Sequence, residues 1–389
     1  MAALYGLSTS NPPFAPVLSA QPNDFTIGLV FTGGGLNSPK SIAIDGSGNA
    51  WIANFHIGSV SASVSEFSSA GNALSPSAGY TGGGLSLADS IAIDGSGNVW
   101  IADGYDNDGY PFAVTGMSEL SNAGAALSPS TGGYLNIGGY FGGGLNGPSS
   151  VAVDGMGNAW FVNSPFLTGV VSKFSGSLAL SPATGYTGGG LSGTNSIAID
   201  GSGNAWIANG PPYSLSKLSS AGTALSPPTT GYKGGGLIYP SSLAIDGLGN
   251  VWAANGGNDS ASKFSNAGVA LSPSTGYTGG GLSDPGSIAI DGAGNAWFTN
   301  LQSVSELSSA GVAISPFGYF STSFGYTGGV FSQPSSIAVD GSGNAWVAND
   351  GNYSVSELIG VAAPVITPIC AGLPATPTAD GSSKLGTRP

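Results

Sequence analysis

Seven aspartates recur in one ten-residue phrase, which first reads IAIDGSGNAW at residues 42–51. Seven equal carboxylates around a channel could hold a cation, because hard cations take oxygen ligands. The phrase lacks the acid density of a calcium loop, however, and a catalytic site needs one special residue rather than equal copies. We therefore expect each carboxylate to accept hydrogen bonds from the amides of its own D-G-x-G-N turn. The copies are Asp45, Asp94, Asp154, Asp200, Asp246, Asp291 and Asp340.

The composition favours many short strands over helices or disorder. The 389 residues include 68 Gly and 25 Pro, yet 41% are hydrophobic, which is enough apolar material for a core. Only seven Lys and Arg occur, and the net charge is −13. A basic stripe for phosphate backbones cannot form from so few cations, so we expect no nucleic-acid partner. No unbroken apolar run is long enough to span a bilayer.

The spacing of the repeat indicates a blade array. Successive aspartates lie 45 to 60 residues apart, a period typical of one four-stranded sheet per repeat. The fourth repeat predicts strands at 196–200, 204–209 and 213–219, and a weaker Pro-containing strand at 223–232. Each repeat ends its phrase with a tryptophan that we expect to fill the space between neighbouring blades. These residues are Trp51, Trp100, Trp160, Trp206, Trp252, Trp297 and Trp346.

The sequence thus predicts an all-β, seven-bladed β-propeller of four-stranded antiparallel blades. The seventh repeat lacks its outer strand, and residues 23–36 align with the missing segment. We expect this N-terminal strand to complete the last blade and close the ring. The domain boundaries are then an N-terminal extension at 1–23, the propeller at 24–360 and a Pro-rich tail at 361–389. A channel lined by repeated Ser, Ala and Asp, beginning at Ser41 and its six equivalents, would favour a scaffold, whereas an ion bound there by a non-repeated acidic ligand would favour an enzyme.

The pattern P-x-S-I-A-I-D-G-x-G-N-x-W-I-A-N followed by V-S-E-F resembles NHL-repeat propellers over roughly residues 24–358. It is also similar to the superfamily of virginiamycin B lyase and SMP-30 gluconolactonases, and to uncharacterised bacterial tandem-repeat envelope proteins. The resemblance implies the fold, and fold does not carry function.

Two departures bear on catalysis. The resemblance to streptogramin lyases implies a His base beside Mg²⁺, but the one histidine, His56, lies in a short loop without a matching arrangement. SMP-30 enzymes hold a divalent ion with Glu, Asn and Asp from different blades, whereas all four Glu here share one third-strand position: Glu66, Glu119, Glu306 and Glu357. We expect no catalytic residues, and no cofactor unless a Ca²⁺ or other divalent ion binds. A metal-dependent lactonase or lyase with a divergent site is the alternative.

The third-strand position carries Lys in the remaining repeats, at Lys173, Lys217 and Lys263. One interpretation is a solvated position whose charge is unimportant. The other is a two-sided charged surface, with opposite charges meeting only between Glu119 and Lys173 and between Lys263 and Glu306.

Variation between repeats gathers in loops that a propeller places on one face. Repeat two inserts DGYDNDGYPFAV after its second strand, and repeats two and six lengthen their exits. Tyr and Phe beside Asp and Asn suit a glycan or peptide. The candidate ligand residues are Tyr105, Asp106, Asp108, Tyr110, Tyr134, Tyr140, Phe141 and Tyr319. The candidate Ca²⁺ ligands are Asp103, Asp106 and Asp108.

We therefore expect a monomeric, non-enzymatic binding or scaffold module with a protein or glycan ligand. The resemblance places it outside the cell or in the bacterial envelope, although the first residues do not read as a signal peptide. The single Cys370 lies in the Pro-rich tail, which reads as an extended linker or strap.

Overall fold

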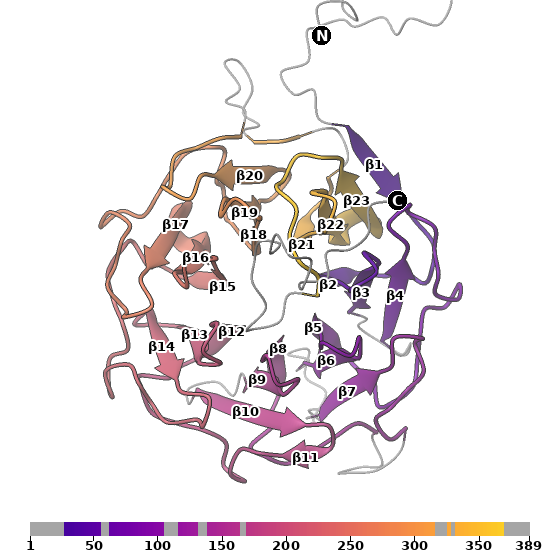
Figure 1. Ribbon diagram of the computed structural model, residues 1–389, viewed down its shortest axis with the longest axis horizontal. Helices are drawn as coiled ribbons and strands as arrows, with labels where there is room; N and C mark the ends of the chain where they lie inside the picture. The colour runs from indigo at the N-terminus through magenta and orange to yellow at the C-terminus, as the bar shows by residue number, and fades with distance from the viewer. Residues whose placement is uncertain are drawn as a thin grey trace, which may run out of the picture.

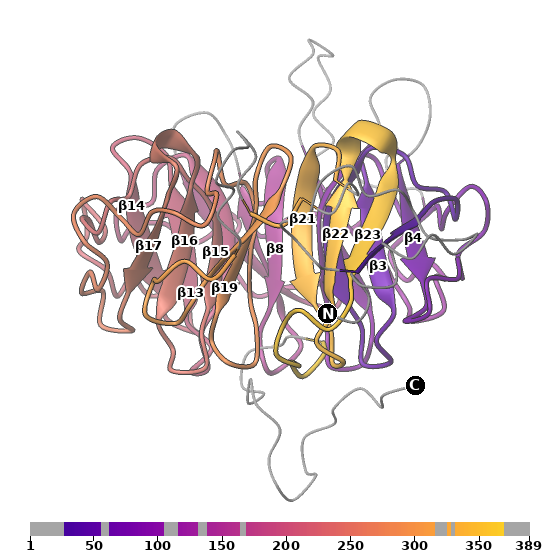
Figure 2. The same ribbon diagram turned by 90° about the horizontal axis from the view of Figure 1, so that it is seen from above.

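The computed structural model describes residues 27–55, 62–104, 116–130, 138–163, 169–315, 325–327 and 331–368. Within these residues the chain forms seven antiparallel sheets of three or four strands, placed around a central axis (Figure 1). The inner strands run along this axis, so loops emerge at two opposite faces (Figure 2). The helical segments of the described part are two short 3₁₀ turns, η2 (Gly256–Asn258) and η3 (Asp350–Asn352).

Each repeat contributes an inner, a middle and a third strand to one sheet. The inner strands are β2 (Pro39–Ile44), β5 (Ala88–Ile93), β8 (Pro148–Val153), β12 (Thr194–Ile199), β15 (Pro240–Ile245), β18 (Ile288–Ile290) and β21 (Pro334–Val339). The middle strands are β3 (Ala50–Asn54), β6 (Val99–Asp103), β9 (Ala159–Asn163), β13 (Ala205–Asn209), β16 (Val251–Asn255), β19 (Ala296–Thr299) and β22 (Ala345–Asn349). The third strands are β4 (Ser63–Phe67), β7 (Gly116–Leu120), β10 (Val170–Ser175), β14 (Ser214–Leu218), β17 (Ser260–Phe264), β20 (Val304–Leu307) and β23 (Ser354–Leu358).

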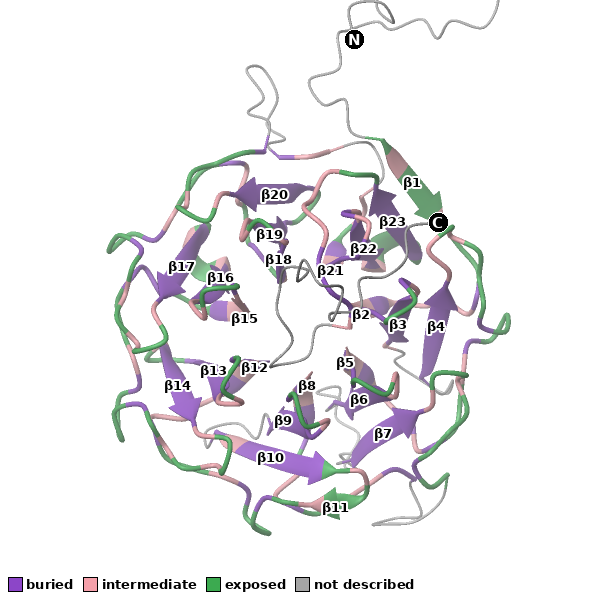
Figure 3. Ribbon diagram, viewed as in Figure 1, coloured by how far each residue is buried: buried purple, intermediate pink, exposed green. Residues whose placement is uncertain are grey.

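The spacing between sheets explains the recurring Ile-Ala-Ile of the inner strands. Ile91 and Ile93 of the second repeat pack against Ala43 and Trp51 of the first, so large side chains of one sheet meet small ones of its neighbour. All seven tryptophans are buried, with at most 1% of their surface exposed to solvent. Figure 3 shows the middle and third strands buried, with exposed residues in the surrounding turns. Each sheet is therefore stabilised mainly by the two beside it.

The same kind of cluster joins the last repeat to the first. Ile42 and Ile44 pack with Trp346 and Ala348 in one buried group. The amide of Ile42 also donates to Ser336 Oγ across this junction, at 3.3 Å. Equivalent serine bridges, from Ile91 N to Ser41 Oγ, Val151 N to Ser90 Oγ and Leu243 N to Ser196 Oγ, link other neighbouring inner strands.

The predicted outer strand is mostly absent from the described residues. Five sheets have three strands, and in the fourth repeat the outer segment pairs with β14 as two isolated bridges, Leu218 to Ala224 and Leu215 to Tyr232, rather than as a strand. Between them the Ser-Pro-Pro segment departs from the ladder, and Ser226 Oγ instead accepts from the Lys217 amide. Prolines cannot donate to a ladder, which is why the expected strand is reduced to two contacts.

The N-terminal segment supplies a continuous outer strand in the last sheet. β1 (Gly28–Phe31) pairs antiparallel with β23, with Leu29 opposite Glu357 and Phe31 opposite Val355. The third repeat also has a fourth strand, β11 (Leu178–Ala179), although it is only two residues long.

Candidate binding site: the central channel and the two faces

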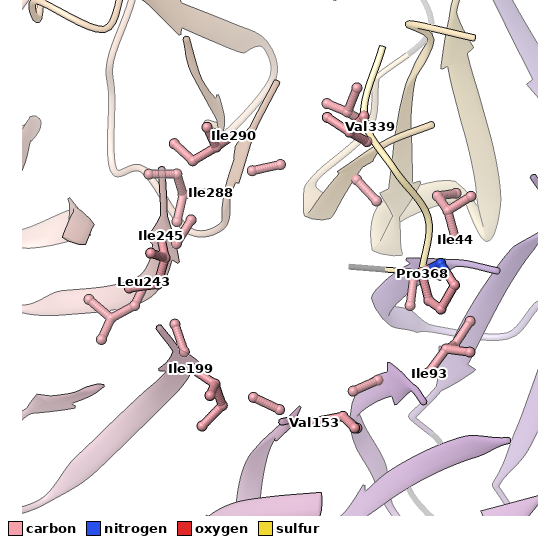
Figure 4. A pocket seen from close by; sticks show the side chains of 18 of the residues that line it. Ile44, Ile93, Val153, Ile199, Leu243, Ile245, Ile288, Ile290, Val339 and Pro368 are labelled. Carbon is pink, nitrogen blue, oxygen red and sulfur yellow. The ribbon is translucent and has the colours of Figure 1, made fainter. Parts of the chain in front are cut away.

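The seven inner strands surround a cavity of about 420 Å³. Its wall is mainly apolar, with two Ile, Val or Leu residues and one Ala from each repeat. Figure 4 shows Ile44, Ile93, Val153, Ile199, Ile245, Ile290 and Val339 around this space. None of the seven repeated serines lines this cavity. Four of them instead accept from the inner strand of a neighbouring repeat: Ser41, Ser90, Ser196 and Ser336. Of the repeated aspartates only Asp246 and Asp291 reach the wall, beside the turns at one end.

Polar side chains mark the end of the channel where the inner strands begin. The second residue of three of these strands donates to a proline carbonyl that begins the inner strand of the next repeat or, for β18, precedes it by three residues. These bonds run from Asn195 Nδ2 to Pro240 O, from Ser241 Oγ to Pro285 O and from Ser335 Oγ to Pro39 O, at 3.1, 2.8 and 2.6 Å. The equivalent Ser149 Oγ is buried and has no partner among the described residues.

Two charged residues occupy the same position in the first and second repeats. Lys40 Nζ lies 3.4 Å from Asp350 Oδ2 in a partly exposed ion pair. Burial raises the pKa of Asp89 to about 6, and the nearby Lys40 partly offsets this. The one cation of this position is therefore already neutralised by carboxylates.

The beginning of the C-terminal tail lines the opposite end of the channel. Val365, Ile366 and Pro368 line the cavity, and the first two are 3% and 5% exposed. The backbone is held by the turns of the last two repeats: Val365 N donates to Asp340 O, Gly292 N to Ala363 O and Ala363 N to Asp291 Oδ2. The tail therefore packs as part of the fold up to residue 368.

Each repeated aspartate is used by its own turn. Asp45 Oδ1 accepts from the amides of Ser47 and Asn49 at 2.8 Å, and Oδ2 accepts from Trp51 Nε1 at 3.1 Å. The indole bond recurs in all seven repeats at 2.9–3.3 Å. Because these oxygens are already occupied, the carboxylates stabilise the hairpin and orient the tryptophan.

The third-strand charges are buried, contrary to the expectation of a solvated or surface position. All seven side chains belong to residues that are 2–6% exposed. Each Lys pairs with the Asp of its own repeat, at 3.1 Å for Lys173–Asp154, 3.2 Å for Lys217–Asp200 and 3.0 Å for Lys263–Asp246. Each ammonium also lies 4.4–4.7 Å from the centroid of the tryptophan ring.

In the other four repeats a Glu faces the same Asp. Asn49 Nδ2 donates to both Asp45 Oδ2 and Glu66 Oε1, and Tyr80 donates to Glu66 Oε2 at 2.8 Å. Burial and the like charge of Asp45 raise the pKa of Glu66 despite these bonds. The same causes raise the pKa of Glu306 and Glu357 to about 7.

In the three repeats that carry a lysine, the pKa of the aspartate is lowered. Burial alone would raise the pKa of Asp154, but hydrogen bonds from Trp160, Asn158 and Lys173 together hold it below its usual value. The pKa values of Asp200 and Asp246 are lowered by the same balance.

Comparison with known proteins places this architecture. No family model and no curated protein matches the sequence. Virginiamycin B lyase from Staphylococcus aureus superposes with a TM-score of 0.58 at 13% identity, covering 86% of this chain and 99% of its own. PorZ, a surface component of the type-IX secretion system of Porphyromonas gingivalis, gives 0.54 at 15% identity, covering 88% of this chain and 48% of its own. The extracellular domain of BT3049 from B. thetaiotaomicron gives 0.53 at 13% identity, covering 88% and 40%.

The chain has the β-propeller fold. At such low identities these likenesses show the fold alone, and the proteins compared include an enzyme, a surface component and an extracellular domain. Among the described residues of the propeller no helix is long and apolar enough to cross a membrane.

Most of the predicted ligand residues lie outside the described residues of the propeller: Tyr105, Asp106, Asp108, Tyr110, Tyr134 and Tyr319, together with His56 and Cys370. Tyr140 is described, and it packs between repeats. Its ring lies 6.4 Å from that of Trp100, and its hydroxyl donates to Glu119 Oε2. Phe141 follows it, close to Gly116 at the start of β7.

Asp103, the remaining candidate Ca²⁺ ligand, is fully buried at the end of β6. Its oxygens accept from the Ser86 amide at 3.2 Å and from Ser118 Oγ at 2.6 Å. Burial raises its pKa to about 7 although both bonds oppose the rise. No group of three His, Cys, Asp or Glu side chains in the described part could hold a metal ion.

The propeller presents an aromatic pair that sequence reasoning missed. Tyr213 and Tyr239 precede β14 and β15, and their ring centroids are 5.8 Å apart. Both have left-handed backbones, with φ of 43° and 57°, and Tyr239 is 56% exposed. Tyrosine at such a φ costs energy that glycine would avoid. The signal in the sequence is weak, because Tyr353 stands at the position of Tyr213 in the last repeat, and the position of Tyr239 varies among Ser, Leu, Gly, Asp and Gln.

Proposed function

We propose that the protein is a seven-bladed β-propeller, closed by β1, that serves as a non-enzymatic binding or scaffold module outside the cytoplasm. It uses the face carrying the β3–β4 type loops to bind a glycan or a protein. The single observation that carries the proposal is that the repeated charged side chains are buried and bonded to one another or to their own turns. Variable chemistry is left to the loops of one face, where binding residues on constant scaffolds usually lie.

The described part of this face supports a ligand with flat apolar surfaces and hydroxyl groups. Tyr239 and Tyr213 supply rings, while Asp259 and Asp284 lie in the neighbouring turns, where the Asp284 amide donates to Asp259 Oδ1 at 2.7 Å. Tyrosine rings beside short polar side chains suit a sugar or a peptide. The predicted loop residues, among them Tyr105, Asp106 and Tyr134, would extend this surface.

A glycan array and a pull-down from envelope extracts with the purified full chain test the proposal. The informative variant is Tyr239→Asn, because Asn tolerates a positive φ and removes the ring. Its loss of affinity for any bound glycan or protein should be roughly tenfold, as for one aromatic contact. The matched control is Leu248→Ser on the opposite face, where Leu248 is 87% exposed and other repeats carry Ser.

If the Tyr239→Asn and Tyr105→Ala variants bind as tightly as the Leu248→Ser control, the loop face is not the binding site. The alternative, a metal-dependent lactonase or lyase with a divergent site, predicts lactone or depsipeptide turnover that depends on a divalent ion. Turnover abolished by a chelator and restored by the ion would replace the binding proposal by this alternative.

A further inference from the structure

The outer edge of the sheet is interrupted in the same way in six repeats. In the first repeat the outer segment pairs with β4 at Phe67–Ala73 and at Val64–Tyr80. Between these bridges β4 advances by three positions and the outer segment by seven, so the outer segment leaves the ladder. The excursion contains a Ser-Pro pair that recurs in repeats one to six, at residues 75–76, 128–129, 181–182, 226–227, 272–273 and 315–316. Prolines and irregular backbone keep an edge strand from pairing with another chain.

The outer strand of the last sheet lacks this excursion. Along β1 the partners on β23 advance in step, one residue for one, and residues 27–31 contain neither proline nor charge. Ile27, Leu29 and Val30 are 64%, 43% and 46% exposed. β1 is the last strand on the outer side of its sheet, at the rim of the ring (Figure 1, Figure 3). It is therefore a regular apolar edge without the protection that the other outer edges have.

The backbone of β1 also directs hydrogen-bonding groups away from the ring. Ile359 N donates to Ile27 O at 2.9 Å, and residues of an antiparallel strand bond alternately to one side and to the other. Residues 27, 29 and 31 therefore bond to β23, whereas the N–H and C=O groups of Gly28 and Val30 point outward. Among the described residues no strand pairs with this side of β1. An extended strand from another chain can be added there.

The residues of β1 are complementary to a second copy of β1. In an antiparallel pair with Leu29 opposite Leu29, Gly28 of each copy lies opposite Val30 of the other, and each such pair exchanges both backbone bonds. On this face of the joined sheet Gly28 has no side chain, which leaves room for Val30. Alternate residues share a face, so on the other face Ile27 of each copy lies beside Phe31 of the other and flanks the two leucines.

We propose that two copies of the protein associate through their β1 strands, forming an isologous dimer with one sheet continuous across both last repeats. The contact is smaller than the roughly 1,200 Å² of a stable interface, so the Kd should be on the order of 10–100 µM. Each copy has a net charge of −13, so association should strengthen as salt screens their repulsion. The rim is separate from the loop face of the proposed function, and either proposal can fail without the other.

Sedimentation velocity of the full chain from about 5 to 200 µM tests the proposal. Leu29→Lys should raise the Kd at least about tenfold, because like charges directly opposite each other destabilise a strand pair. The matched control is Leu74→Lys in the first repeat: Leu74 is 48% exposed and lies beside Glu66 as Leu29 lies beside Glu357. This control should dimerise as the wild type does, and melting temperatures check that both variants fold. The monomer expected from the sequence, at all these concentrations, would overturn the proposal, as would equal weakening by both variants.

A cross-link locates the contact even if the lysine variant does not fold. In a Cys370→Ser chain, Leu29→Cys should form a disulfide between copies on mild oxidation, because opposite residues of a non-hydrogen-bonded pair lie within disulfide reach. Leu74→Cys in the same chain should remain uncross-linked, and equal cross-linking of the two would overturn the assigned contact. A chain starting at Asp24 should dimerise as the full chain does. Dimers seen only after this truncation would show that residues 1–23 cover β1, and would overturn the dimer of the full chain.

Discussion

The Phe31 ring stacks on the indole of Trp346, with centroids 5.6 Å apart and planes inclined by 27°, although the two residues are 315 positions apart in the sequence. Tyr80 makes the same contact with Trp51 inside the first repeat, at 5.5 Å. Phe31 thus supplies the aromatic ring that the last repeat lacks. A Cβ on Gly71, in the first repeat's outer turn, would lie 1.9 Å from Phe31, so the ring fits between the last and first sheets.

Phe31→Ala should destabilise the ring where its two ends meet. The ring is only partly buried, so the loss should be about 2–3 kcal/mol, at or below the lower end for a core Phe. Urea unfolding followed by tryptophan fluorescence measures it. The control is Phe31→Tyr, which restores the residue found in the other repeats and should cost less than about 1 kcal/mol. If Ala and Tyr behave alike, the stacking contact contributes nothing to closure.

Asp103→Asn should stabilise the protein above neutral pH. Asn54 Nδ2 donates to Ser65 Oγ at 2.9 Å, and Asp103 faces the equivalent Ser118 at 2.6 Å. Ser118 also lies 3.0 Å from Gly83 O, so protonated Asp103 can donate to Ser118 as Asn does and leave the serine proton for Gly83. An ionised Asp103 cannot.

The sign follows from the raised pKa. Burial raises the pKa of Asp103 from 3.8 to about 7, so its stabilising protonated form is favoured at low pH and its contribution is lost as pH rises from about 4 to about 7. The advantage of Asp103→Asn should grow over that window to roughly 1–3 kcal/mol and stay constant above it. Thermal unfolding at pH 5 and pH 8 checks this. An advantage that shrinks with rising pH would contradict it.

The repeated phrase made the fold predictable because it contains the strands and turns locally. Strands at 194–199, 205–209 and 214–218 match those expected for the fourth repeat to within two residues. The hairpin between the first two needs only an Asp that accepts from its own turn, and this is a short-range property. The prediction of a continuous outer strand was wrong for a local reason as well, because its prolines interrupt the backbone hydrogen bonds to the third strand.

The channel and the third-strand charges could not be predicted in the same way. Glu66 reads as an outward position of an alternating strand, and its burial depends on Tyr80, 14 residues later, and on Asp45, 21 residues earlier. The contribution of the tail to the channel wall was missed because the Pro-rich composition of residues 361–389 indicates a linker. The apolar side chain of Val365 indicates that it is buried, but only the arrangement of the seven sheets shows which residues it contacts.

Truncation after Gly360 should destabilise the protein and remove part of the channel wall. The truncation exposes the surface that Val365 and Ile366 cover, and each buried aliphatic side chain contributes about 1.5–3 kcal/mol before the entropy of ordering the tail is subtracted. We expect a net loss of about 1–3 kcal/mol. Differential scanning calorimetry measures it, with a chain ending at Pro368 as the control. If both truncations leave the melting temperature at that of the full chain, residues 361–368 are not part of the cooperative fold.

Glu357→Lys should stabilise the last repeat at pH 8. Burial first and the charge of Asp340 second raise the pKa of Glu357 from 4.5 to about 7. Its contribution to stability is therefore complete below pH 4.5 and lost as pH rises to about 7. A lysine would instead meet Asp340 as Lys217 meets Asp200, over the face of the tryptophan. Glu357→Gln, the control, should flatten the pH dependence without the ion pair. Urea midpoints at pH 5 and pH 8 decide the matter: a lysine variant no more stable than wild type at pH 8 would show that the pairing does not transfer between repeats.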